Sequence, residues 1–175
     1  MRIKLLVLVF SILFYITGCD RSYYFKNTRT TALTAENIDG LKLHDNIYES
    51  KFIEKYGKQT KPSQDNEFYD YYRLRDDLEI ATVKEGKQKG DIVRITIQYE
   101  DYDMKQSDAH TEKGIKLGST KEEVLSSYGE NYYVRNEQGA NIIGYIDTKM
   151  QVTLEFWLDD KEQVALIRFD DADVQ

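Results

Sequence analysis

Apolar and polar side chains alternate along several short stretches of the chain, and this period of two predicts half-buried antiparallel strands. Residues 93–99 and 152–158 show the alternation most clearly. Polar turns separate the stretches, as expected for hairpins. Six strands are therefore predicted, at residues 68–74, 78–85, 91–99, 141–147, 151–158 and 163–170.

One short helix signal precedes each group of three strands. In the second half, Ser119 and Glu122 have the spacing of a capping box, and apolar residues then follow one helical face up to Gly129. In the first half a similar signal runs from Asn46 to Gly57. The Tyr-Gly pairs that end the two signals, at positions 56–57 and 128–129, are 72 residues apart. The strands keep the same offset, which indicates an internal repeat.

These patterns predict an α+β fold made of two tandem repeats, each a short helix or helix pair packed on a three-stranded antiparallel meander. Repeat one is expected at residues 38–102 and repeat two at residues 103–175. Residues 19–37 show no clear period and are interpreted as a tether. Tyr23, Tyr24 and Phe25, in this segment, are expected either at a membrane interface or packed on the domain.

The first 19 residues have the layout of a secretory signal. Two cations, Arg2 and Lys4, precede an apolar run at residues 5–16 that is too short to span a bilayer. The following segment, Ile16-Thr17-Gly18-Cys19, resembles a bacterial lipobox and holds the only cysteine of the chain. We therefore predict a lipoprotein signal peptide at residues 1–18, lipidation of Cys19, and a location on the extracytoplasmic face of a cell membrane.

The charge of the chain limits its partners. The net charge is −7, and removal of residues 1–18 takes away two basic residues and no acidic one, which leaves −9. An acidic protein is a poor ligand for nucleic acid, so nucleic-acid binding is not expected. Tyrosine is abundant, with 14 residues, and tyrosines suit both half-buried sheets and contact surfaces.

A resemblance to known families comes from the second repeat. The run Gly-Ile-Lys-Leu-Gly-Ser-Thr-Lys-Glu-Glu-Val at residues 114–124, followed by Tyr128-Gly129, resembles small lipoprotein domains of the outer-membrane assembly type. Together with the duplication, it also resembles the tandem-repeat fold of β-lactamase inhibitor proteins. The resemblance implies helices on one face of an antiparallel sheet, a binding surface and no catalysis.

Motifs for chemistry are weak in this sequence. His44 and His110 have no ligand spacing, and the acidic clusters do not match a calcium loop, so no metal or cofactor is expected. No serine lies in a nucleophile motif. Two carboxylates brought together by folding would still allow glycoside hydrolysis, which leaves this alternative open. We expect that the protein is not an enzyme.

The candidate binding residues lie on the strands. If the apolar side chains of each strand face the helices, five others face outward: Tyr69, Tyr71, Arg73, Tyr145 and Trp157. Tyrosine, tryptophan and arginine dominate binding hot spots. The alternatives are that two sheets cover each other and bury these rings, or that long polar side chains shield them.

The sequence therefore predicts a membrane-anchored bacterial lipoprotein that acts as a non-catalytic protein-binding module. One alternative is an inhibitor or immunity protein, whose acidic surface would block a cationic extracellular enzyme or toxin. Another is a small-ligand carrier or an enzyme of unrecognised type. An enclosed polar pocket would favour this last alternative.

Overall fold

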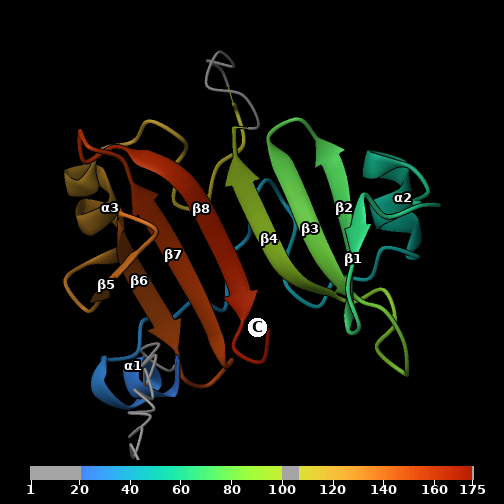
Figure 1. The fold of residues 1–175 in the computed structure, drawn as a ribbon, viewed down its shortest axis with the longest axis horizontal. Coiled ribbons are helices and arrows are strands. Elements are labelled where there is room, and N and C mark those ends of the chain that lie inside the picture. Colours follow the sequence, from blue (N-terminus) through green and yellow to red (C-terminus); the bar gives the residue numbers. More distant parts are fainter. Residues whose placement is uncertain (1–20, 100–106, 175) are drawn as a thin grey trace, which may run out of the picture.

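One antiparallel sheet forms the centre of the molecule in the computed structural model, which describes residues 21–99 and 107–174. In these residues eight strands follow the order β1-β2-β3-β4-β8-β7-β6-β5 (Figure 1). The bounds are β1 Gln64–Asp65, β2 Tyr69–Arg75, β3 Leu78–Val83, β4 Ile92–Gln98, β5 Tyr133–Glu137, β6 Ala140–Asp147, β7 Val152–Leu158 and β8 Val164–Asp171. The signal peptide predicted at residues 1–18 and Cys19 lie outside the described residues.

The continuous sheet corrects the prediction of two tandem repeats, each with its own three-stranded meander. The last strand of each half, β4 and β8, pair with each other from Arg94↔Asp170 to Gln98↔Leu166. This pairing removes two exposed strand edges and joins the halves into a single sheet. The short strands β1 and β5 were also not predicted, because β1 has two residues and β5 contains mostly polar ones.

Two of the three described helices follow the predicted signals, with shifted starts. The helices α2, Ser50–Tyr56, and α3, Lys121–Tyr128, end at Gly57 and Gly129. The capping box of α3 is formed by Thr120 and Glu123, one residue later than predicted. The predicted cap, Ser119, is buried and accepts a hydrogen bond from the Lys116 N–H in the preceding turn.

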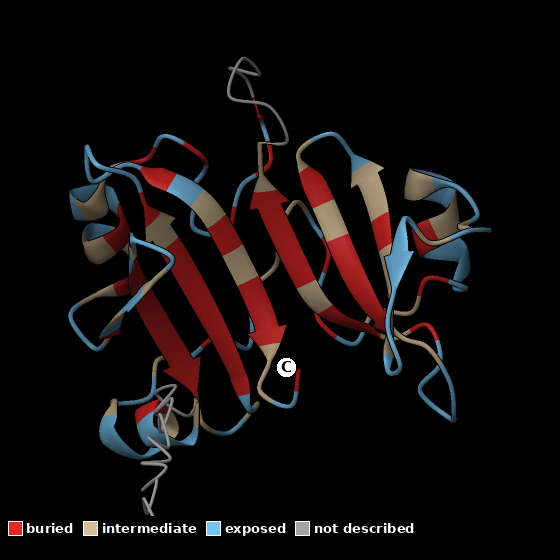
Figure 2. Ribbon diagram, viewed as in Figure 1, coloured by how far each residue is buried: buried red, intermediate tan, exposed pale blue. Residues whose placement is uncertain are grey.

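The hydrophobic core lies between the sheet and these two helices. We call this side of the sheet the covered face. Buried side chains from the central strands, such as Ile95, Phe156 and Phe169, meet Phe52 of α2 and Val124 of α3 in one cluster. Figure 2 shows the consequence, with buried residues concentrated along the inner strands and exposed ones on the helices and outer turns.

The N-terminal segment packs on the sheet, which corrects the tether interpretation for its described part. Residues Arg21–Asn27 form α1, where Tyr24 is buried. Further along, Leu33 is 1% exposed, and its N–H donates to Asp147 Oδ2 at 2.9 Å. None of the helices described is long and apolar enough to cross a membrane.

Candidate functional site on the open face of the sheet

The sheet has a second face that α2 and α3 do not cover, and we call it the open face. Strand alternation places Arg94 of β4, Arg168 and Asp170 of β8, and Glu155 and Trp157 of β7 there, because at least one sequence neighbour of each is a core residue of the covered face. Charged side chains thus occupy the middle of this face.

Four of the five predicted binding residues lie on the open face, and one does not. Tyr69, Tyr71, Arg73 and Trp157 are half-buried there. Tyr145 is fully buried in the covered face, so its predicted outward orientation was wrong.

The residues around Tyr145 show why it points inward. Its ring packs against Tyr128 and Phe156, and its hydroxyl donates to the Gly129 carbonyl at 2.9 Å. A phenol buried with a partner for its hydroxyl is a stable core residue.

The four open-face residues do not form one cluster. Tyr69 and Tyr71 pack with Ala81, Val93 and Val174 in a small apolar group. Trp157 lies on β7, four strand spacings from β2, or roughly 19 Å across the sheet. Arg73 forms a separate ion pair with Glu79 at 3.3 Å.

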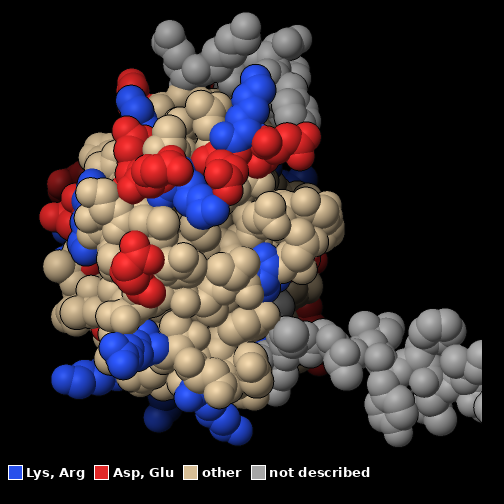
Figure 3. Space-filling model, turned by 90° about the vertical axis from the view of Figure 1, so that its left-hand side faces the viewer, with Lys and Arg blue, Asp and Glu red and all other residues tan. Residues whose placement is uncertain are grey.

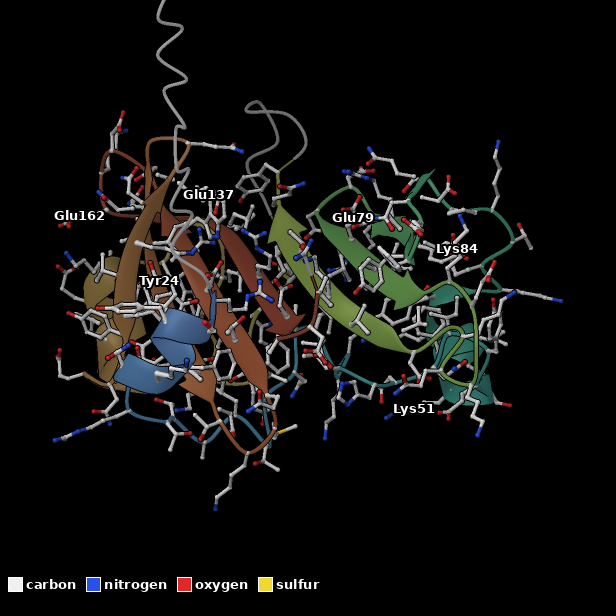
Figure 4. All side chains as sticks on the ribbon, turned by 60° about the horizontal axis from the view of Figure 1, so that its bottom comes forward. Tyr24, Lys51, Glu79, Lys84, Glu137 and Glu162 are labelled. Carbon is white, nitrogen blue, oxygen red and sulfur yellow. The ribbon has the colours of Figure 1, made fainter. Side chains whose placement is uncertain are left out.

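A hollow of about 520 Å³ lies on the second-half side of the open face. Arginine dominates its lining, which also includes aromatic, acidic and C-terminal residues: Arg21, Tyr24, Arg94, Tyr133, Arg135, Glu137, Glu155, Arg168, Ala172, Asp173 and Val174. The helix α1 borders this part of the sheet, and Figure 4 shows α1 with Tyr24 in front of the second-half strands, far from Lys51 of α2.

A buried carboxylate, Asp170, lies beneath two of the arginines. It is 1% exposed, and both of its oxygens accept from Arg94, at 2.8 and 3.0 Å. Arg21 donates to the same carboxylate at 3.0 Å, and its other amino group reaches the carbonyls of Asp171, Ala172 and Val174. Arg21 therefore holds the C-terminal turn against the rim of the hollow.

A second buried carboxylate, Glu155, lies beneath the other two arginines. Arg135 binds both of its oxygens, at 2.9 and 2.8 Å, and the Tyr133 hydroxyl donates to it at 2.6 Å. Burial tends to raise the pKa of Glu155, but the hydrogen bonds from Arg135 and Tyr133 outweigh it and lower the pKa below its ordinary value. Glu155 is thus held as an anion in the floor of the hollow.

Arg168 is the least compensated of the four arginines. Its nearest carboxylate oxygen, Oε2 of Glu155, is 3.6 Å from Nη2, beyond hydrogen-bonding distance. Its Nε is buried and has no hydrogen-bond partner among the described residues. The guanidinium lies over the Trp157 ring, 4.6 Å from the centroid. Burial lowers the pKa of Arg168, and the nearby Arg94 and Arg135 act in the same direction.

Tyr133 reaches Glu155 only because residue 144 is a glycine. An ideal Cβ at Gly144 would lie 2.1 Å from the Tyr133 Cζ, so the ring lies directly over the backbone of β6. On its other side the ring stacks on Tyr24 of α1, with centroids 4.3 Å apart. Gly144, Tyr133 and Tyr24 therefore form one stack that connects the sheet to α1.

Sequence reasoning missed the hollow because its parts are far apart in the chain. Arg94 and Asp170 are joined only by the β4–β8 pairing, and Arg21 was assigned to a tether. One sequence signal does point to a charged sheet face. In the last two strands charged residues alternate with apolar ones, namely Glu155 in β7 and Arg168 and Asp170 in β8.

The lining of the hollow combines guanidinium groups, tyrosine rings and carboxylates. In residues 21–99 and 107–174, no group of three or more His, Cys, Asp or Glu side chains is arranged to hold a metal ion. Guanidinium groups and aromatic rings can instead bind oxyanions and planar groups.

A scan against protein-family models finds no match for this chain, and a search of curated proteins finds none either. Among solved structures, the chain is similar to a DUF4309 family protein (YjgB) from Bacillus subtilis, with a TM-score of 0.45 and 12% sequence identity. The similarity covers 87% of this chain and 93% of that one. At this level of similarity, a functional interpretation has to rest on the residues of this chain.

Proposed function

We propose that this protein is a membrane-anchored bacterial lipoprotein that binds an acidic surface of a protein partner with the open face of its sheet. The observation that carries the proposal is the hollow of about 520 Å³ lined by four arginines, with Trp157 beside it and the tyrosines of β2 on the same face. Arginine, tyrosine and tryptophan around a partly desolvated depression are the composition of binding hot spots.

The charge distribution supports an acidic partner. The chain is acidic overall, yet guanidinium groups surround the hollow, so its local charge differs from the average. Figure 3 shows that charge is unevenly placed on the β5 end too, with acidic and basic side chains mixed in the upper part and basic ones along the lower edge. Complementary charge favours a partner of opposite sign at the hollow and makes association sensitive to salt.

The proposed anchor would bring the hollow close to the membrane. Cys19 precedes Arg21 by two residues, which span at most about 7 Å, and Arg21 lines the hollow. A partner on the same membrane surface would then meet the open face directly. We expect Cys19→Ala to keep the size of the precursor in a gel, and processing unchanged from the wild type would contradict the anchor.

The test of binding is crosslinking of the lipidated protein in its own cells, with a Tyr71→Ala/Trp157→Ala variant and a Tyr48→Ala control. Tyr48 is an exposed aromatic residue, 48% accessible, outside the hollow. We expect one acidic protein to be captured by the wild type and by Tyr48→Ala, and lost in the double variant. Equal capture by all three would contradict a binding role for the open face.

A second candidate, a small-ligand carrier, is favoured by the size of the hollow, which falls in the range of ligand sites. It predicts that a small molecule from cell extract remains bound during purification. Native mass spectrometry of the wild type and of the Tyr71→Ala/Trp157→Ala variant distinguishes the two, because a carrier shows an added small mass and a protein-binding module does not.

A further inference from the structure

The arginines of the hollow differ in how they are hydrogen-bonded. Three arginines have carboxylate partners within hydrogen-bonding distance: Arg21 and Arg94 share Asp170, and Arg135 binds Glu155. Arg135 also pairs with Glu137 at the rim. Four guanidinium groups thus lie beside four carboxylates, three of which accept hydrogen bonds from these arginines, while the fourth, Asp173, is exposed to solvent.

Arg168 is the one guanidinium of the four without a carboxylate hydrogen bond, because its ion pair with Glu155 is 3.6 Å long. The side chain of Arg168 is 18% exposed, it lines the hollow, and its Nε has no hydrogen-bond partner among the described residues. A guanidinium carries five N–H donors in a rigid fork, and leaving them unpaired in a desolvated place is unfavourable. A group supplied from outside the chain would relieve this.

The residues around Arg168 hold its guanidinium in one position on the open face. Its guanidinium lies on the Trp157 ring at 4.6 Å, and Trp157 donates through Nε1 to Glu155 at 3.3 Å. Register places Arg168 between Thr96 of β4 and Glu155 of β7 in the middle of the sheet. Sites on strands hold their side chains more precisely than sites on loops.

We propose that the hollow is a carboxylate-binding subsite in which Arg168, held on Trp157 and flanked by Arg94 and Arg135, receives one carboxylate group of the partner. The inference rests on the proposed function and specifies its chemistry. The planar fork of arginine matches the two oxygens of a carboxylate. The carboxylate comes either from an Asp or Glu side chain of a partner protein or from a small free acid.

The chain carries its own reporter for this subsite, because Trp157 is its only tryptophan. The protein produced from the full chain is titrated at constant ionic strength with blocked Ala-Glu-Ala, blocked Ala-Gln-Ala and sodium glutarate, and Trp157 fluorescence is recorded. We expect a saturable change with Ala-Glu-Ala and none with Ala-Gln-Ala. Arg168→Gln should weaken the response about tenfold or more, as for loss of a charge-assisted hydrogen bond.

Matched variants separate binding from folding. Arg29→Gln removes an exposed arginine outside the hollow and should leave the titration unchanged. Arg168→Lys keeps the charge without the fork and should bind with intermediate strength. Circular dichroism of each variant, compared with the wild type, shows whether it is folded.

The outcomes distinguish the subsite from the wider proposal. A response to glutarate without one to Ala-Glu-Ala supports the carboxylate subsite but counts against a protein partner. A response to Ala-Glu-Ala supports both. No response to either acid beyond that to Ala-Gln-Ala, or an equal response in folded Arg168→Gln, overturns the subsite, while partner capture in cells would still test the open face independently.

Discussion

Phe156 and Trp157 are neighbours on β7, yet they face two differently built parts of the molecule. Phe156 is completely buried in the covered face among aromatic and aliphatic side chains. Trp157 is half-buried on the open face, where Arg135 and Arg168 lie over its ring. The covered face buries apolar area, which stabilises the fold, whereas the open face keeps charges in a partly desolvated hollow, which favours binding more than stability.

The largest expected effect comes from substituting the two adjacent residues of β7 one at a time. Phe156→Ala should lower the free energy of unfolding by about 3–5 kcal/mol, because it leaves a cavity in the core. Trp157→Ala should lower it by only about 1 kcal/mol, mainly through lost contacts with the two guanidinium groups. Urea unfolding of both variants measures the difference, and equal losses would mean that Trp157 is a core residue.

The next effect concerns the buried charge of the open face. Glu155→Gln keeps the shape of the side chain but removes the carboxylate that both Arg135 and Arg168 contact, so that Arg135 keeps only Glu137 at the rim. We expect a loss of about 3 kcal/mol, as for breaking a buried ion pair by removing one partner. Glu162→Gln, an exposed glutamate paired with Lys121 at the surface, is the control and should change stability by less than about 1 kcal/mol. A small effect of Glu155→Gln would show that the floor of the hollow is not held by this carboxylate.

Gly144→Ala tests the stack that joins α1 to the sheet. The added Cβ would occupy the place of the Tyr133 ring, so the ring must move away from Glu155 and from Tyr24. We expect a loss of about 1–3 kcal/mol from overpacking. Amide hydrogen exchange should increase in α1 more than in β8. Unchanged protection of α1 would show that Tyr133 does not hold it.

The pH dependence of stability provides a further test, because the pKa values of two buried glutamates shift in opposite directions. In Glu36, near α3, burial raises the pKa above 4.5, so its contribution to stability is present at low pH and is lost as pH rises through the folded-state pKa. In Glu155 the pKa is below 4.5, so its contribution is present above 4.5 and is lost as pH falls through the folded-state value.

The measurement is urea unfolding as a function of pH. Glu155→Gln should flatten the fall in stability below pH 4.5, and Glu36→Gln should flatten the rise that occurs as pH is lowered toward 4.5. An identical pH dependence of the free energy of unfolding in the wild type and both variants would contradict the opposite pKa shifts of Glu36 and Glu155.

Local patterns in the sequence predict the long strands but not their arrangement. Apolar and polar residues alternate clearly in β4 and β7, so the polar residues identify the side of each strand that faces away from the core. In β6, Ile142 and Ile146 lie on one side and Ile143 and Tyr145 on the other, so both sides are apolar and the orientation of Tyr145 could not be assigned.

The hollow could not be predicted because it depends on contacts between distant segments. The β4–β8 pairing that brings Arg94 to Asp170, and the contact of Arg21 with the C-terminal turn, are set by tertiary packing. The polar strand β5, which supplies Tyr133 and Arg135, carries no alternation of apolar residues that would reveal a strand. Single residues such as Gly144 acquire meaning only when the neighbouring strand is known.

The most direct test of the account is the free energy of unfolding of Arg168→Gln compared with the wild type, measured in urea without added carboxylate. If Arg168 serves binding, its removal eliminates only a long ion pair and a buried Nε that has no hydrogen-bond partner among the described residues, while Glu155 keeps Arg135 and Tyr133 as partners. The account therefore predicts equal or higher stability, within about 0.5 kcal/mol or above. A loss of about 2 kcal/mol or more would contradict it and make Arg168 part of the structural framework.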